Sequence, residues 1–204
     1  MAAEWAELGQ GPATIGIRKD DAWRVQPPPA DLVTRRVELA APATFEDAAR
    51  VAGSGADVWV ADLEDSLVPT WPWLLEAHEA IADYLSEADQ GQRPTLMVRP
   101  RGLHLDDVHL DVAAPIVDVG MVVARHSKAL AAFGSAPYFY LPKIETHAEA
   151  IWWNDLLGAV EKAWSLPIGS IRVSVLLQTV HAAPDGRNSA RPSYAGHGVD
   201  CWPL

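Results

Sequence analysis

Cysteine is nearly absent from this sequence: Cys201 is the only one among 204 residues. A single cysteine cannot form a disulfide within the chain, and it cannot build a structural zinc site from thiolates. Runs of about 18 apolar residues are also absent, so the sequence predicts no membrane-spanning helix. The N-terminus lacks a basic stretch followed by an apolar core. We therefore expect no secretory signal, no membrane partner and a cytoplasmic protein.

Positive charge is scarce as well. The chain has 16 Lys and Arg residues against 27 Asp and Glu residues, which gives a net charge of −11. Because no cluster of basic residues offsets this balance, we expect no nucleic-acid partner. A few local cations would still suffice to bind a small anionic substrate. The length and the hydrophobic fraction of 49% are typical of one globular domain.

Common catalytic motifs are missing too. The sequence has no GxGxxG, no Walker A segment, no GxSxG and no HExxH. Its seven histidines are scattered, and His104 and His109 have no third partner at metal-ligand spacing. We interpret them as ordinary surface or core histidines.

What the sequence does contain is an alternation of short apolar runs and helical stretches. Strands are predicted at 57–62, 95–99, 116–123, 137–143 and 171–177, after a possible short strand at 34–39. Helices are predicted at 44–51, 72–88, 127–132 and 146–164. Thr70 is a candidate N-cap, and Thr146 with Glu149 forms a capping box. This order predicts a parallel α/β sheet, either open and doubly wound or part of a (β/α)8 barrel.

Composition divides the chain into three parts. Residues 1–43 are irregular and Pro-rich, and residues 44–179 carry the strands and helices of the predicted sheet. Residues 180–204 have no periodicity and are rich in Pro, Gly, Ser, Ala and Arg. We expect this last segment to be a disordered tail.

Charged side chains follow several predicted strands. In parallel α/β folds ligands bind beyond the carboxyl ends of the strands. Carboxylates and arginines there suit Mg²⁺ and a small anionic oxo-acid. Three simpler interpretations remain: Asp65 caps the next helix, the arginines only pair with the carboxylates, or Lys143 pairs locally with Glu145. The residues at these strand ends are Asp62, Glu64, Arg99, Arg101, Lys143, Glu145 and Gln178.

Several segments, in the same order, resemble malate synthases of the shorter bacterial and plant type. The resemblance runs from about Ile17 to Thr179. It is carried by Asp20–Val25, Arg35–Glu38, Val58–Ser66 with Pro69–Trp71, Val98–Leu105, Pro137–Lys143, and Glu145–His147 with Trp153–Asp155.

The resemblance implies a (β/α)8 TIM barrel, of which this chain holds about five of eight strands. It also implies a glyoxylate-cycle transferase that condenses acetyl-CoA with glyoxylate and water to give malate and CoA, using Mg²⁺. By motif match, Arg99 is the arginine that stabilises the developing negative charge. Asp62 and Glu64 match the acidic pair that supports the hydrated metal, and Ser66 matches a position near the acetyl-CoA thioester.

The sequence departs from the family pattern at its end. Gln178 stands where the family has a metal-ligating glutamate, and the later Gly-Arg-Trp-Asp segment and the catalytic aspartate are absent. The segment 122–126 is also altered. We therefore expect a chain truncated or frameshifted after about Thr179. Two alternatives stay open: a C–C lyase similar to the citrate-lyase-β and malyl-CoA-lyase group, or a non-catalytic fragment or pseudoenzyme.

Overall fold

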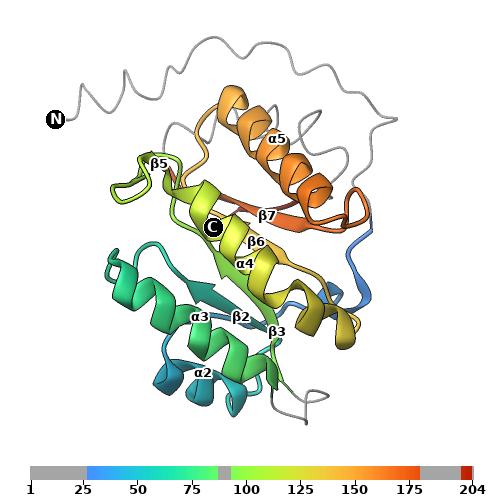
Figure 1. Ribbon diagram of the computed structural model, residues 1–204. Coiled ribbons are helices and arrows are strands. Elements are labelled where there is room, and N and C mark those ends of the chain that lie inside the picture. Colours follow the sequence, from blue (N-terminus) through green and yellow to red (C-terminus); the bar gives the residue numbers. More distant parts are fainter. Residues whose placement is uncertain (1–26, 87–92, 180–198, 204) are drawn as a thin grey trace, which may run out of the picture.

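The fold is a parallel α/β sheet covered by helices. In the computed structural model of the chain, the structure describes residues 27–86, 93–179 and 199–203. Six strands form one parallel sheet in the order β1-β2-β3-β6-β7-β8 (Figure 1). Their bounds are β1 Glu38–Pro42, β2 Val58–Asp62, β3 Thr95–Arg99, β6 Tyr138–Leu141, β7 Arg172–Leu177 and β8 Val199–Pro203.

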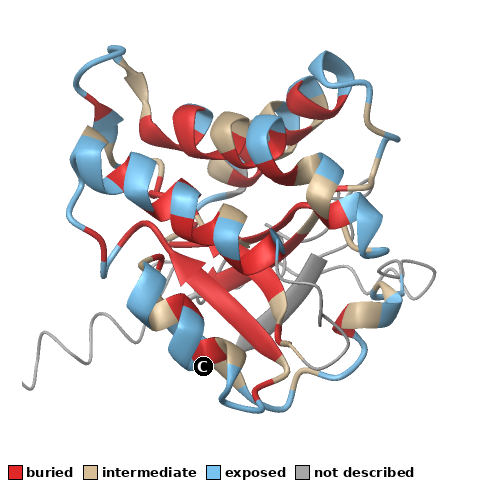
Figure 2. Cartoon of the chain, turned by 60° about the horizontal axis from the view of Figure 1, so that its bottom comes forward, coloured by how far each residue is buried: buried red, intermediate tan, exposed pale blue. Residues whose placement is uncertain are grey.

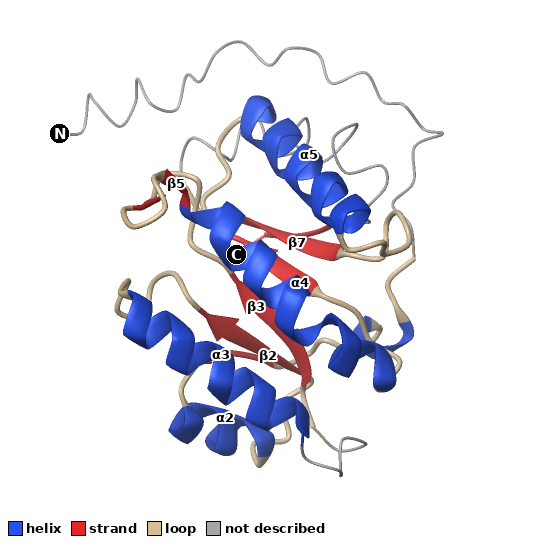
Figure 3. Cartoon of the chain, viewed as in Figure 1, coloured by secondary structure: helices blue, strands red, loops and turns tan. Residues whose placement is uncertain are grey.

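Four α-helices of the described residues connect these strands. They lie together on one face of the sheet (Figure 3). A short 3-10 helix, η1 (Ala30–Leu32), precedes β1, and a two-stranded hairpin follows β3. None of the described helices is long and apolar enough to cross a membrane. The helices are α2 Phe45–Ala52, α3 Trp71–Ser86, α4 Ala114–Ala132 and α5 His147–Ala163, and the hairpin consists of β4 Asp106–Asp107 and β5 Val112–Ala113.

The core occupies both faces of the sheet. On the helix-covered face, side chains such as Trp59, Val98 and Phe139 pack into one large cluster. On the other face, Val60 and Met97 belong to a smaller cluster with Leu32, Val58 and Tyr138. The strand β2 is buried along its whole length and β3 and β6 along most of theirs, whereas the edge strand β1 is partly exposed. The outer helix surfaces are exposed (Figure 2). This two-sided burial explains the nearly continuous apolar runs of the strand sequences.

The predicted α/β class and the partial barrel are confirmed. Within the described residues, no pairing joins β1 to β8, so the barrel is open. The strand predicted at 95–99 matches β3, and the capping box predicted at Thr146 and Glu149 is present at the start of α5.

One predicted strand is wrong. Residues 116–123 belong to α4, which also contains the short helix predicted at 127–132. Pro115 lies in the first turn of α4, where a missing N–H costs no hydrogen bond. Val119, Val122 and Val123 are buried in the large core cluster, so the apolar run forms the side of α4 that packs on the sheet. A short apolar run fits a buried helix as well as a buried strand, and here the helix forms.

Both ends of the predicted barrel region also differ from expectation. β1 lies at Glu38–Pro42, somewhat later than the short strand expected at 34–39 and inside the segment 1–43 that was predicted to be irregular. In the tail predicted to be disordered, Val199–Pro203 forms β8 and pairs in parallel with β7. Residues 1–26 and 180–198 lie outside the described residues.

Candidate functional site

The candidate site lies at the carboxyl ends of β2, β3, β6 and β7. Asp62 ends β2 and Arg99 ends β3, and the parallel register makes these two residues direct cross-strand partners. Lys143 follows β6, and Gln178 follows β7. Strand register alone therefore brings the first two candidate residues together.

Asp62 and Arg99 form a buried two-pronged ion pair. Arg99 Nε donates to Asp62 Oδ1 at 2.7 Å, and Arg99 Nη2 donates to Asp62 Oδ2 at 2.6 Å. The backbone N–H groups of Glu64 and Ser66 donate to the same carboxylate at 2.9 and 3.0 Å, and so does the Ser66 hydroxyl. Burial works to raise the pKa of Asp62, but the hydrogen bonds from Arg99 and Ser66 outweigh it and lower this pKa. Asp62 is therefore a fixed anion that orients Arg99.

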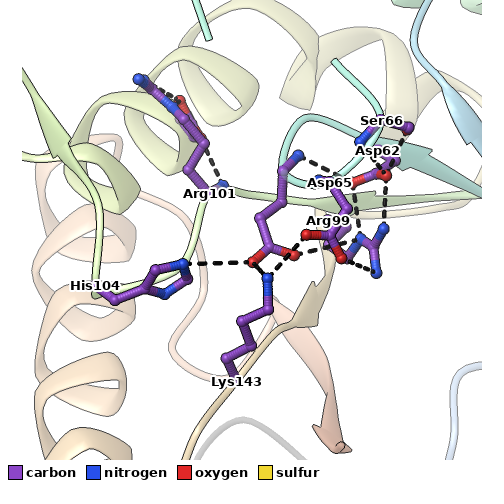
Figure 4. Close-up of polar contacts among 9 residues, drawn as sticks. Asp62, Asp65, Ser66, Arg99, Arg101, His104 and Lys143 are labelled. Carbon is purple, nitrogen blue, oxygen red and sulfur yellow. Dashed lines mark hydrogen bonds and ion pairs between the residues drawn. The ribbon is translucent and has the colours of Figure 1, made fainter. Parts of the chain in front are cut away.

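A second ion pair lies beside the first (Figure 4). Lys143 Nζ donates to Glu64 Oε1 at 2.6 Å and to Asp65 Oδ1 at 2.8 Å. Arg99 lies close to both acids, with its Nε 3.8 Å from Glu64 Oε2 and its Nη1 3.5 Å from Asp65 Oδ2. The hydrogen bond from Lys143 is the main cause that lowers the pKa of Asp65. Three acids and two cations thus form one network at the rim.

The backbone at Lys143 has an uncommon conformation. Its φ is 50°, in the left-handed region that favours glycine over residues with a Cβ. Burial opposes the charge on Lys143, but hydrogen bonds to Asp65 and Glu64 raise the pKa of the ammonium above its ordinary value. Lys143 is therefore a fully charged cation directed at the acids.

Arg101 does not join this network, although it follows Arg99 by only two residues. Its side chain turns toward the N-terminal part of α4, away from Asp62 (Figure 4). Its Nη2 donates to Asp118 Oδ1 at 2.7 Å and to Asp107 Oδ2 at 3.1 Å, and Asp118 Oδ2 accepts from the Arg101 backbone N–H at 2.7 Å. Asp118 is fully buried. This cluster ties the end of β3 to α4 and to the hairpin.

Two side-chain oxygens among the predicted site residues lack a hydrogen-bond partner among the described residues. Within the part of the chain that the structure describes, Glu64 Oε2 and Gln178 Oε1 are buried without a hydrogen-bond donor. In the same part, no group of three or more His, Cys, Asp or Glu side chains is placed to hold a metal ion. Mg²⁺ is commonly bound by one or two protein oxygens, with water and substrate filling the rest. The two unpartnered oxygens are of the types, carboxylate and amide, that Mg²⁺ accepts as ligands.

The structure brings together four of the predicted site residues, Asp62, Glu64, Ser66 and Arg99. Gln178 lies directly after β7. The local Lys143–Glu145 pair was only one interpretation, and Lys143 instead pairs with Glu64 and Asp65 in the loop after β2. Asp118, the buried partner of Arg101, was not predicted from the sequence, because it lies in the run interpreted as a strand. The one signal in the sequence was that Asp118 is the only charged residue in this otherwise apolar run.

The family profile and the curated relatives that follow are all malate synthases. A family profile described as "Malate synthase, TIM barrel domain" matches residues 95–188. A malate synthase from Streptomyces clavuligerus is 37% identical over 193 residues, covering 84% of this chain and 36% of that protein. Malate synthase A from Escherichia coli is 32% identical and is covered to 35%. The chain thus spans about a third of the length of these curated relatives.

Solved structures share the fold at lower identity. A Haloferax volcanii malate synthase in a magnesium and glyoxylate complex has a TM-score of 0.56 and 17% identity, covering 76% of this chain and 47% of that one. A citrate lyase from Burkholderia xenovorans has a TM-score of 0.54 and 19% identity, covering 74% and 43%. These likenesses concern the fold alone.

Proposed function

Because this chain belongs to the malate synthase family over the part that it spans, we propose that its rim carries out the family reaction. In that reaction a base takes a proton from the methyl carbon of acetyl-CoA, a role that falls to solvent here because the family aspartate is absent from this sequence. The methyl carbon then bonds to the aldehyde carbon of glyoxylate, and the aldehyde oxygen takes up a proton. Water then cleaves the thioester, which releases CoA and leaves malate. The observation that carries the proposal is the Asp62–Arg99 pair beside Glu64, on two neighbouring strand ends.

Arg99 is the residue we propose to act on the substrate. Its guanidinium is held on one edge by Asp62, through Nε and Nη2. The remaining nitrogen, Nη1, lies 3.5 Å from Oδ2 of Asp65, whose side chain is half exposed. This nitrogen is therefore the part of the guanidinium nearest to solvent-exposed groups of the rim. A fixed cation stabilises an oxyanion without having to reorient during the reaction. Asp62 then acts as a positioning residue for Arg99.

We propose that Glu64 and Gln178 hold Mg²⁺ through their free oxygens. When bound, Mg²⁺ would polarise the aldehyde oxygen of glyoxylate as a Lewis acid. Gln178 offers an amide oxygen without the negative charge of the family glutamate, so the metal should bind weakly. The solved malate synthase with magnesium and glyoxylate supports this choice of metal and substrate.

We propose that Ser66 faces the thioester of acetyl-CoA, as its motif position implies. Its hydroxyl donates to Asp62, so the group that would face the thioester is tied to the same carboxylate that holds Arg99. A malate synthase structure that contains pyruvate and acetyl-CoA supports acetyl-CoA as the second substrate.

A thiol-release assay tests the proposed function. Purified protein is mixed with acetyl-CoA, glyoxylate and millimolar Mg²⁺, and free CoA is followed with a thiol reagent. We expect CoA release that requires both glyoxylate and metal, with malate as the second product. Release that is independent of glyoxylate, or no release at all, would contradict the proposal for this chain.

A C–C lyase is the second candidate, because the citrate lyase fold also matches. Such an enzyme forms or cleaves the carbon–carbon bond but keeps the thioester. Product analysis by mass spectrometry separates the two: malate with free CoA supports the synthase, whereas an intact malyl thioester supports the lyase.

A further inference from the structure

We propose that Lys143 is an internal counter-ion that occupies the place of the divalent cation and thereby limits how tightly the rim binds metal. This inference deepens the proposed function and rests on it. It concerns the chain's own residues, namely the ammonium of Lys143 and the carboxylates of Glu64 and Asp65.

The geometry of Lys143 is that of a bound cation. Its Nζ bridges Glu64 Oε1 and Asp65 Oδ1, at 2.6 and 2.8 Å. The Glu64 side chain is only 1% exposed, so its charge needs a partner. Arg99 is already bound through two nitrogens to Asp62 and reaches Glu64 only at 3.8 Å. Lys143 is therefore the main neutralising group of Glu64.

A metal ion on Glu64 would compete with Lys143. Any cation bound through the free Oε2 lies within a few ångströms of Oε1, and therefore of Nζ. Two cations this close repel each other strongly in a partly buried site. Metal binding thus requires Lys143 either to tolerate that repulsion or to leave the carboxylate.

The Lys143 side chain can move away from Glu64. Its side chain is 30% exposed, so the ammonium has a path to water. Its four-carbon stem is flexible, and Asp65, with a side chain 49% exposed, remains available as an outer partner. The left-handed backbone at Lys143 aims the side chain across the sheet at β2, and such uncommon backbone conformations cluster at switching and ligand-binding positions.

The test is calorimetric binding of Mg²⁺ alone, without substrate, to the full chain. Lys143→Met removes the competing charge, and we expect it to bind Mg²⁺ at least about tenfold more tightly than wild type, equivalent to about 1.4 kcal/mol. The matched control is Lys162→Met, at an exposed position near the end of α5. It changes the net charge equally and should leave the affinity within about twofold of wild type.

Two more variants distinguish loss of the charge from misfolding of the Lys143→Met variant. Lys143→Gln also lacks the charge but keeps a polar N–H donor, and it should bind Mg²⁺ more tightly than wild type. Lys143→Arg keeps the charge and should bind with wild-type affinity. Equal or weaker binding by both neutral variants, or no Mg²⁺ binding by any variant, would overturn the proposal.

This outcome is separable from that of the proposed function. Tighter metal binding by Lys143→Met, with no CoA release at saturating Mg²⁺, would uphold the counter-ion role and refute the synthase activity. Glyoxylate-dependent CoA release together with unchanged metal affinity would uphold the activity and refute the counter-ion role.

Discussion

Two histidines buried between helices should make this fold sensitive to mild acid. His78 on α3 and His126 on α4 are fully buried, and His78 Nδ1 lies 3.0 Å from His126 Nε2 in a hydrogen bond. The rings stack with centroids 5.3 Å apart. Burial, together with the charges of His126 and Arg125, lowers the pKa of His78 to about 3. Burial and Arg125, opposed by Glu79, lower the pKa of His126 to about 4.

The magnitude follows from the difference between folded and unfolded states. An unfolded histidine has a pKa of about 6.5, so below that pH the unfolded chain gains protons that the folded chain does not accept. The free energy of unfolding is therefore unaffected above about pH 7 and falls as the pH drops toward 4. At pH 5.5 each histidine accounts for a loss of about 1.4 kcal/mol, or about 3 kcal/mol for both. That is a large part of a typical domain stability of roughly 5–15 kcal/mol.

Urea unfolding at pH 7.5 and at pH 5.5 measures this loss. Wild type should lose about 3 kcal/mol more over this interval than a His78→Leu/His126→Leu double variant. The comparison uses each protein's own change with pH, so a difference in their absolute stability does not affect it. An equal pH dependence in wild type and the double variant would refute the buried neutral pair.

Three further changes have direct structural consequences. Asp118→Asn should destabilise the protein by roughly 3–5 kcal/mol in urea unfolding, because it leaves Arg101 buried with a weakened partner; a loss below about 1 kcal/mol would contradict this. Gln178→Glu replaces an amide whose oxygen has no hydrogen-bond partner among the described residues by a charged carboxylate, so calorimetry should show tighter Mg²⁺ binding, and unchanged affinity would remove Gln178 from the site. Thr146→Ala removes the N-cap of α5 and should cost about 1 kcal/mol, whereas exposed Ser86→Ala should cost less.

Local signals predicted much of the fold. The capping box at Thr146 fixes the start of α5 through contacts within one turn, so it can be recognised from four residues. The strand at 95–99 is bounded by Pro94 and Pro100, which limit where a ladder can run. Because parallel strands end at one edge, the meeting of Asp62 and Arg99 also followed from strand positions alone.

Long-range packing determined the rest. The run at 116–123 becomes helical because its apolar side chains are buried against the sheet, which depends on elements far away in the sequence. Arg101 leaves the rim because Asp118 on that same helix accepts its backbone and its side chain. The contact between Lys143 and Glu64 spans 79 positions, and no spacing rule relates them. The His78–His126 pair, 48 positions apart, was equally invisible in a list of scattered histidines.

The most direct test of the account compares Arg99→Ala with Arg50→Ala in the CoA-release assay. Both changes remove one positive charge, but Arg50 lies at the exposed end of α2, where its partners among the described residues are Glu46 and Asp47 of the same helix. We predict that Arg99→Ala lowers glyoxylate-dependent CoA release by about 10²-fold or more, while Arg50→Ala leaves it unchanged. Equal release by wild type and Arg99→Ala, or none from wild type, would contradict the claim that this rim performs the reaction.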